Sequence, residues 1–201
     1  MAAAVPTVET ERLVLRPWRP GEDLDALASL NADPRVMRWI APFRPLSRAE
    51  SAALLERIVA HWTEHGYGLW AVSPRAAAGD APAGRAAPAA AECIGFAGLA
   101  VPAFLPAVLP AVEVGWRLLP AWWGRGLATE AARAAVAHAF GPLGLARVVS
   151  VVDPGNAASL RVVEKLGMRR GADRVHPVTR RRLRVFELDA PAGRGGAPPL
   201  P

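Results

Sequence analysis

Two glycines one residue apart, Gly124 and Gly126, stand between a strand-like segment at 112–118 and an alanine-rich, helix-like segment at 128–140. Where a strand passes through glycines into a helix, unpaired backbone N–H groups and the positive end of the helix dipole meet in one place. Such a turn is suited to binding a phosphate group. An isolated Gly-x-Gly is nevertheless common, so on spacing alone an ordinary turn is an equal alternative.

The size and composition of the chain favour a single, well-buried domain. It has 201 residues, of which 52% are of hydrophobic types. No apolar run reaches about 18 residues, so we expect no membrane span. The first residues lack a basic segment followed by an apolar core, so we expect no secretory signal and a cytoplasmic protein.

Residues that form disulfides or bind metals are few. Cys93 is the only cysteine, which excludes an internal disulfide, and a lone cysteine at a strand start is typical of a small buried residue rather than a nucleophile. His61 and His65 share a helical face, but no third ligand accompanies them. We therefore expect no metal site.

The chain carries a formal net charge of +6, and Lys165 is its only lysine. A basic balance suits a polyanionic ligand such as a nucleotide cofactor, and it equally suits weak adhesion to nucleic acid. The preference for arginine, together with abundant alanine, proline and glycine, is also what a coding bias produces. Individual arginines must therefore be judged by their positions.

Two segments have the composition of disordered chain. Residues 75–91 and 190–201 consist largely of alanine, glycine and proline and have almost nothing to bury. The first lies between two strand-like runs, so we interpret it as a long hairpin loop, which costs little closure entropy. We therefore predict one domain at 8–189 with an insertion at 75–91 and a tail at 190–201.

Apolar periodicity and turn residues predict the elements. Ser47 and Glu50 form a capping-box pattern at the start of a helix that ends near Gly66, and Gly167 is a typical glycine after a helix end. Predicted strands span 12–16, 67–72, 93–101, 112–118, 148–152 and 183–188, with a short one within 168–174, and predicted helices span 24–30, 47–66, 124–140 and 157–166. The order predicts an α/β fold with one mixed, mostly antiparallel sheet and helices on both faces.

Four segments carry a resemblance to a known family. They are TERLVLRP at 10–17, NADPRVMRW at 31–39, WGRGLATEA at 123–131 and NAASLRVVEKLGM at 156–168. In this order they resemble the GNAT superfamily of N-acetyltransferases, in particular the branch of bacterial ribosomal-protein N-terminal acetyltransferases. The resemblance implies the GNAT acyl-CoA N-acyltransferase fold and acetyl-CoA as co-substrate, with no metal.

The resemblance places the pyrophosphate of acetyl-CoA at the glycine turn. The implied donors are the backbone N–H groups of Gly124, Arg125, Gly126, Leu127 and Ala128, with the hydroxyl of Thr129 in addition. Glycine permits a close backbone approach that a Cβ atom would obstruct. The side chain of Arg125 either contacts a phosphate or points to solvent. Trp123 departs from the superfamily motif, which often begins with Gln or Arg.

The resemblance also implies that the strand at 112–118 splays from the strand at 148–152 and that the pantetheine arm lies between them. The backbone positions that would pair with the arm are Trp116, Arg117 and Leu118. Gly115 suits a bulge or a close approach of the ligand, with a plain strand irregularity as the alternative. Asn156 is the family position that binds the arm, and its alternative role is to cap the helix that follows.

Acetyl transfer to an amine needs a base, because the acceptor amine is mostly protonated at neutral pH. Glu113 is the candidate, since alternation puts it on the same strand face as Gly115 and Arg117; its alternative role is a solvated carboxylate. The family often uses tyrosine as the general acid, but the only tyrosine, Tyr67, lies in another element. Ser159 is the candidate donor to the departing thiolate, or else it caps the first turn of its helix.

We therefore predict an acetyl-CoA-dependent N-acetyltransferase that acts on a primary amine, either a protein N-terminus or a small molecule. The alternative is a GNAT-fold module of weak activity that binds RNA or ribosomes through its basic C-terminal region. The arginines of that region are Arg169, Arg170, Arg174, Arg180, Arg181, Arg182 and Arg184. They partly alternate with apolar residues, as at an exposed sheet edge, so we do not expect nucleic acid as a partner. We expect a monomer or a homodimer with no membrane partner.

Overall fold

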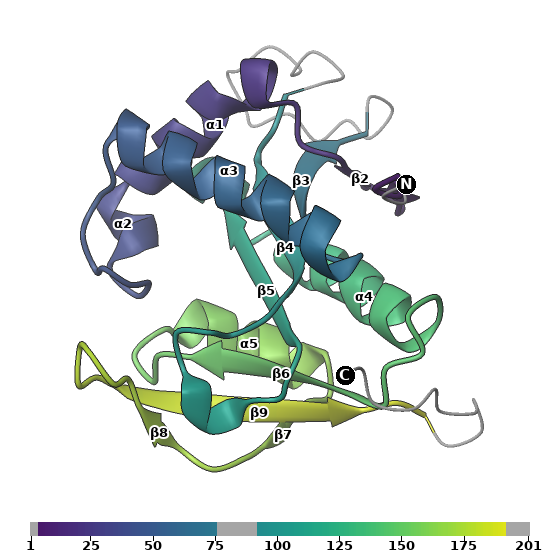
Figure 1. The fold of residues 1–201 in the computed structure, drawn as a ribbon, viewed down its shortest axis with the longest axis vertical. Coiled ribbons are helices and arrows are strands. Elements are labelled where there is room, and N and C mark those ends of the chain that lie inside the picture. Colours follow the sequence, from purple (N-terminus) through teal and green to yellow (C-terminus); the bar gives the residue numbers. More distant parts are fainter. Residues whose placement is uncertain (1–3, 76–91, 192–201) are drawn as a thin grey trace.

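The computed structural model describes residues 4–75 and 92–191 (Figure 1). Within them the chain forms one mixed sheet with helices on both faces, as predicted. The predicted disordered segments at 75–91 and 190–201 lie outside the described residues, apart from Arg75, Ala190 and Pro191. The domain bounds of 8–189 stay a prediction.

The described elements follow the predicted order with small shifts at their ends. The strands are β1 (Val8–Glu9), β2 (Leu13–Arg16), β3 (Leu69–Pro74), β4 (Gly95–Ala100), β5 (Glu113–Leu118), β6 (Arg147–Val152), β7 (Arg169–Arg170), β8 (Arg174–Val175) and β9 (Arg182–Asp189). The helices are α1 (Pro20–Ala32), α2 (Pro34–Met37), α3 (Arg48–His65), α4 (Leu127–Phe140) and α5 (Ala157–Lys165), with short 3₁₀ turns at Pro106–Val108 and Pro120–Trp122. Sequence periodicity missed β1, α2 and β8, because two to four residues are too few to establish a period, and the one short strand predicted within 168–174 corresponds to β7.

The strands are hydrogen-bonded in the order β1-β2-β3-β4-β5-β6-β9-β7, and β8 pairs with β9. Neighbouring strands are antiparallel except β5 and β6, which are parallel. Helix α4 connects these two strands and packs on the sheet, as the predicted β-α-β unit requires. The mixed, mostly antiparallel sheet is confirmed.

Local signals set the helix ends. Ser47 Oγ accepts the N–H of Glu50 at 3.2 Å, and the Glu50 carboxylate accepts the N–H of Ser47 at 2.8 Å, which confirms the predicted capping box of α3. Gly66 follows α3 with a left-handed φ of 72°. Between α1 and α2, Asp33 Oδ1 accepts the N–H of Arg35 at 2.8 Å and so caps α2.

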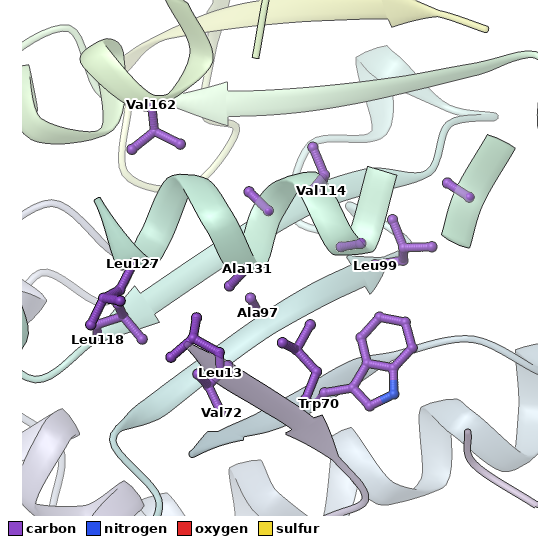
Figure 2. Close-up of a cluster of buried hydrophobic side chains, with 14 of the residues drawn as sticks. Leu13, Trp70, Val72, Ala97, Leu99, Val114, Leu118, Leu127, Ala131 and Val162 are labelled. Atoms are coloured by element: carbon purple, nitrogen blue, oxygen red, sulfur yellow. The ribbon is translucent and has the colours of Figure 1, made fainter. Parts of the chain in front are cut away.

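The main core lies between α4 and the sheet (Figure 2). Ala131, Ala135 and Ala139 repeat along one face of α4, are fully buried, and let the helix approach the strands closely. The strand side chains in this core include Leu13, Val72, Leu99, Val114, Leu118 and Val148. Because the even-numbered residues of β5 point into this core, its odd-numbered residues point to the opposite face of the sheet.

Helices α1 and α3 cover that opposite face with a second core. Leu27 of α1 and Leu55 and Ile58 of α3 share it with Phe96 of β4. A third, smaller cluster continues on β6 and β9, where Leu105 from the loop between β4 and β5 is almost fully buried. The strand residues that it covers are Val149, Leu183 and Val185.

Strands β5 and β6 are paired at one end only. Glu113 is in register with Val149, and the N–H of Val149 donates to the carbonyl oxygen of Val112 at 2.9 Å. Beyond this point the two strands diverge towards the side where α2 and α5 lie (Figure 1). Within the described chain, residues 115–118 pair with β4 but with nothing on β6. The predicted splay is confirmed.

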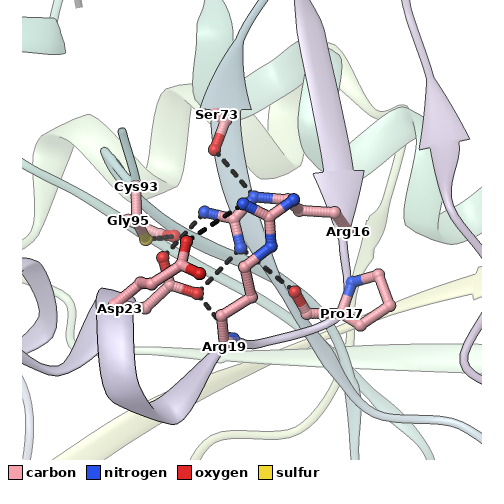
Figure 3. Close-up of polar contacts among 8 residues, drawn as sticks. Arg16, Pro17, Arg19, Asp23, Ser73, Cys93 and Gly95 are labelled. Carbon is pink, nitrogen blue, oxygen red and sulfur yellow. Dashed lines mark hydrogen bonds and ion pairs between the residues drawn. The ribbon is translucent and has the colours of Figure 1, made fainter. Parts of the chain in front are cut away.

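A buried ion pair attaches α1 to β2. Arg16 at the end of β2 and Asp23 in the first turn of α1 keep only 8% and 2% of their side chains exposed. Nη1 and Nη2 of Arg16 each donate to one carboxylate oxygen of Asp23 at 2.7 Å (Figure 3). Asp23 also accepts the N–H of Arg19 at 2.7 Å, and Nε of Arg16 donates to Ser73 Oγ at 3.2 Å. These bonds compensate both charges for the loss of water.

We predict that Asp23→Ala lowers the free energy of unfolding by about 3–5 kcal/mol, because it leaves the Arg16 guanidinium buried without its carboxylate. Asp25→Ala is the matched control in the same helix, α1. The Asp25 carboxylate pairs with Arg48 of α3, but it is 81% exposed and this pair contributes little. Urea denaturation of both variants measures the difference. Equally small losses in the two variants would show that the buried pair does not anchor α1.

Candidate functional site

A cavity of about 510 Å³ opens where β5 and β6 have diverged. Its wall is formed by the end of β5, the turn into α4, the first turn of α4, the start of α5, and α2 with the residues after it. The predicted site residues on this wall are Trp116, Arg117, Leu118, Gly124, Gly126, Leu127, Ala128, Thr129, Asn156 and Ser159. Glu113 and Arg125 are not on it. The fold thus brings together ten of the twelve residues that the sequence singled out.

The two glycines of the turn have left-handed backbone conformations. The φ angles of Gly124 and Gly126 are 77° and 79°, which residues with a Cβ atom adopt only at a cost. A Cβ on Gly124 would meet nothing within 4 Å, and one on Gly126 would meet only Nη2 of Arg12, at 3.6 Å. Within the protein, these positions therefore favour glycine because of their backbone conformation and not because a side chain would clash. The space beside the turn is open.

Gly126 is the N-cap residue of α4, and no described side chain caps this helix end. The N–H of Glu130 donates to the carbonyl oxygen of Gly126 at 3.0 Å and begins the helical ladder. The N–H groups of residues 127–129 precede that bond and have no acceptor within the helix. The positive end of the helix dipole therefore lies at the cavity wall, where it favours an anion.

The side chains next to Gly124 hold the turn in place. Nε1 of Trp123 donates to the carbonyl oxygen of Leu118 at 2.7 Å, while the residue as a whole is 45% exposed and lines the cavity. The guanidinium carbon of Arg125 lies 4.8 Å from the centre of the Trp122 ring. Arg125 thus stacks on an indole instead of facing the cavity or pointing simply to solvent.

Asn156 caps α5, which was the alternative role considered for it. Its Oδ1 accepts the N–H of Ser159 at 3.2 Å. Its Nδ2 donates to no described residue, and Asn156 also lines the cavity, so capping leaves the amide NH₂ available for a ligand. The hydroxyl of Ser159 makes no hydrogen bond to a described residue, and the capping role belongs to Asn156.

Glu113 lies where the gap between β5 and β6 begins. Its Oε1 accepts the N–H of Val151 of β6 at 3.2 Å. If the pairing of β5 with β6 continued, a backbone carbonyl of β5 would accept this N–H instead. Loss of hydration raises the pKa of Glu113 to about 7. The residue is partly exposed, but its bond to the backbone of β6 distinguishes it from the free, solvated carboxylate of the alternative interpretation. Gly115 pairs regularly with Gly98, so there is no bulge, and a Cβ on Gly115 would meet open space.

Arg117 reaches from β5 to α1 on the same face as Glu113. Its Nη1 donates to Oδ1 of Asn31 at 2.6 Å, and Nδ2 of Asn31 in turn donates to Oγ of Ser51 at 3.1 Å. The guanidinium also lies 4.9 Å from the centre of the Phe96 ring. Burial lowers the pKa of Arg117 to about 10, so it remains a cation at neutral pH. The role of Asn31 was not visible in the sequence.

The two arginines in the wall formed by α2 and the residues after it were also missed. Arg35, Arg38 and Trp39 line the cavity there, and the guanidinium of Arg38 lies 4.4 Å from the centre of the Trp39 ring. Trp39 packs so closely on Gly155 that a Cβ on this glycine would lie 2.6 Å from the ring. The NADPRVMRW segment therefore closes the cavity over the loop before α5. No periodic signal marks this, because the contact joins residues more than a hundred positions apart.

The cavity wall is strongly cationic. Its charged residues are Arg35, Arg38, Arg117, Arg161 and Lys165, and no aspartate or glutamate is among the described residues that line it. Arg35 pairs with Asp33, which lies outside the wall, at 2.6 Å, so its charge is largely neutralised. A cavity lined by one sign of charge concentrates ligands of the opposite sign. This distribution suits a polyanion.

The C-terminal arginines are mostly paired with carboxylates. Arg169 pairs with Asp189 at 2.6 Å, and Arg170 pairs with Asp173 at 3.1 Å. Arg181 pairs with Asp153 at 3.3 Å. These pairs neutralise much of the basic region, as expected for an exposed sheet edge.

Other candidate chemistry is not supported by geometry. Burial raises the pKa of the Cys93 thiol to about 11, and its Sγ donates to the carbonyl oxygen of Gly95 at 3.1 Å, so it is a poor nucleophile. Over the described ranges, no three or more histidine, cysteine, aspartate or glutamate residues gather where they could hold a metal ion. None of the helices in these ranges has the length and apolar character needed to cross a membrane.

Comparison with known proteins places this geometry in a family. A family model described as the acetyltransferase (GNAT) domain matches residues 12–169. The chain is 31% identical over 178 residues to the FsC-acetyl coenzyme A-N(2)-transacetylase of Aspergillus fumigatus, which is 82% of this chain and 66% of that protein. It matches two Bacillus subtilis relatives at 42% and 40% identity over only 57 and 58 residues, about a third of their lengths.

Solved structures have the same fold. An acetyltransferase from Agrobacterium tumefaciens superposes with a TM-score of 0.72 at 28% identity, over 94% of this chain and 96% of that one. RimL, a ribosomal L7/L12 alpha-N-protein acetyltransferase in complex with coenzyme A, superposes with a TM-score of 0.69 over 92% of this chain and 98% of its own. Its 13% identity bears on the fold alone. The family match over most of the sequence, together with this fold, shows that the chain belongs to the GNAT acetyltransferase family.

Proposed function

We propose that this protein is an acetyl-CoA-dependent N-acetyltransferase that transfers an acetyl group to a primary amine. The observation that carries the proposal is the cationic cavity between the free edge of β5 and the uncapped N-terminus of α4. A long ligand with phosphates at one end and an amide-containing arm at the other fits both features. Membership of the GNAT family makes acetyl-CoA the expected ligand.

The donor would bind in two parts. Its pyrophosphate would accept hydrogen bonds from the N–H groups of Gly124, Arg125, Gly126, Leu127 and Ala128 and from the Thr129 hydroxyl. Its arm would extend β5 as an added strand at the backbone of Trp116, Arg117 and Leu118, which have no partner on β6. The free Nδ2 of Asn156 is placed on the same wall and would donate to an amide oxygen of the arm.

The acceptor amine would approach from the opposite face of the sheet. Glu113, Gly115 and Arg117 share that face, and the missing side chain of Gly115 leaves the strand backbone open between the other two. A carboxyl group with a pKa of about 7 can take a proton from the amine near neutral pH. The neutral amine nitrogen then forms its bond to the carbonyl carbon as the C–S bond breaks. The thiolate takes a proton from Ser159 or from water, and the second proton that the nitrogen loses replaces the one given up by that group.

The acceptor class rests on the relatives and not on the cavity alone. The Aspergillus relative is named an N(2)-transacetylase and RimL an alpha-N-protein acetyltransferase, so both names describe transfer to nitrogen. A protein N-terminus and a small amine both remain acceptors of this proposal. The RNA-binding alternative is not favoured, because Arg169, Arg170 and Arg181 are engaged by carboxylates.

We predict that acetyl-CoA at about a hundredfold excess over its Kd raises the Tm by roughly 5–10 °C, from a stabilisation of about 2.7 kcal/mol. Gly126→Glu should abolish this shift, because a carboxylate would meet the pyrophosphate and the left-handed backbone disfavours a side chain. Gly66→Glu is the matched control, with a φ of 72° and open space around it at the end of α3. Differential scanning fluorimetry measures all three proteins. No shift in the wild type would overturn the proposed function.

A second prediction concerns the catalytic role of Glu113. With an acceptor that the wild type uses, kcat/KM should rise with pH through a midpoint near 7, where Glu113 ionises. Glu113→Gln should lower kcat about 100-fold to 10,000-fold and remove that inflection. Glu164→Gln, an exposed change on α5, is the control. A Glu113→Gln protein that keeps both rate and inflection would exclude Glu113 as the base.

The same ionisation of Glu113 should lower the stability of the folded protein as the pH rises, whereas it raises kcat/KM. Because the pKa of Glu113 is about 7 in the fold against 4.5 for the free side chain, the folded state holds its proton more tightly. Wild-type stability therefore falls as the pH rises from about 4.5 to about 7. Glu113→Gln lacks this loss and should unfold at a higher temperature than the wild type above pH 7, with no difference below the lower value. Thermal unfolding across this pH range checks the sign.

A further inference from the structure

A network of hydrogen bonds joins the segment before β2 to the turn before α4. Glu130 in the first turn of α4 accepts the hydroxyl of Thr10 at 2.6 Å and the N–H of Arg12 at 2.8 Å on Oε1. Its Oε2 accepts Nε and Nη2 of Arg12 at 2.8 and 2.7 Å. Thr10 is itself held, because its Oγ1 accepts the N–H of Leu13 at 3.0 Å. The carboxylate thus receives four donors from one short segment.

The same arginine also reaches the glycine turn. Nη1 of Arg12 donates to the carbonyl oxygen of Arg125 at 3.0 Å, and Nη2 lies near Gly126 on the side where a Cβ would project. Arg125 is the residue between the two glycines, and its carbonyl group points toward Arg12. Turning this carbonyl to Arg12 fixes the orientation of the peptide group that it shares with the N–H of Gly126, one of the proposed pyrophosphate donors.

The charge of Glu130 makes this network matter for an anionic ligand. A carboxylate in the first turn stabilises the helix dipole, but it also places a negative charge within one turn of the pyrophosphate position. Burial works to raise the pKa of Glu130, and the bonds from Thr10 and Arg12 outweigh it and lower that pKa. Glu130 is therefore ionised, and among the described residues the cation that pairs with it is the Arg12 guanidinium.

We propose that Arg12 is a positioning residue for acetyl-CoA: it orients the glycine turn through the carbonyl of Arg125 and screens the pyrophosphate from the charge of Glu130. This inference rests on the proposed function. It gives the TERLVLRP segment a role in donor binding, although the segment lies far from the turn in sequence and its backbone belongs to β2 and the residues before it. Arg12 acts through its neighbours and is not assigned a contact with the reacting atoms.

A similar network elsewhere in the chain provides a matched control. Glu50 in the first turn of α3 accepts the N–H of Ser47, and its two oxygens accept Nη1 and Nη2 of Arg44 at 3.1 and 2.6 Å. Arg44 and Glu50 do not line the cavity. Arg44→Met therefore removes the same kind of bonds at a helix start without touching the proposed donor site.

The test is the Kd of acetyl-CoA, measured by isothermal titration calorimetry for the wild type, Arg12→Met, Arg44→Met and the double variant Arg12→Met with Glu130→Gln. We expect Arg12→Met to raise the Kd at least tenfold and Arg44→Met to leave it within twofold. The double variant should recover at least threefold of the loss, because it removes the repelling charge, and this recovery should shrink at high salt. Arg12→Lys, which keeps the charge but loses the planar fork, should lie between wild type and Arg12→Met and serves if Arg12→Met does not fold.

The outcomes separate the two proposals. A wild type that does not bind acetyl-CoA overturns the proposed function and this inference with it. A wild type that binds, with Arg12→Met or Arg12→Lys binding equally well, overturns the role of Arg12 and leaves the proposed function standing. A double variant that binds no better than Arg12→Met overturns the screening of Glu130, because a merely structural role of the network would make the second loss add to the first.

Discussion

The single point of pairing between β5 and β6 determines where the rest of the site can lie. Glu113 and Val149 are in register there, and the next free N–H of β6, that of Val151, donates to the carboxylate of Glu113 instead of to the backbone of β5. Had the parallel pair continued, it would have used the edge of β5 that now borders the cavity. Because the Glu113 side chain takes the N–H of Val151, the pairing of β5 with β6 ends and the edge of β5 stays free. The same bond holds the Glu113 carboxylate at the start of the gap.

Two arginines of one short segment attach the helices on either side of the sheet next to this gap. Arg16 at the end of β2 binds Asp23 in the first turn of α1, and Arg12, just before β2, binds Glu130 in the first turn of α4. The two helices lie on opposite faces of the sheet (Figure 1). The first pair is buried and attaches the helix layer of the proposed acceptor face. The second is partly exposed and holds the turn of the proposed donor face.

The net charge of the chain is less informative than the placement of its arginines. Those of the C-terminal strands lie among carboxylates such as Asp173 and Asp189, which neutralise them. Arg38 and Arg161 line a cavity with no described carboxylate on its wall, where their charges add to those of Arg117 and Lys165. Arg35, beside them, is instead paired with Asp33. The net charge of +6 therefore reflects both kinds of arginine, and only the second kind bears on the ligand.

Local sequence was sufficient for the longer elements and for the glycine turn, because capping residues, strand alternation and left-handed glycines act over a few residues. The shortest elements, β1, α2 and β8, were missed. It was also sufficient for the face on which Glu113 lies. It left open whether Asn156 caps its helix, and it did not foresee that Arg125 stacks on Trp122 or that Trp39 closes the cavity over Gly155. These outcomes, like the raised pKa of Glu113, depend on contacts and burial between segments far apart in the chain. Only the tertiary structure decides them, because desolvation and close packing are properties of the assembled environment and not of any one segment.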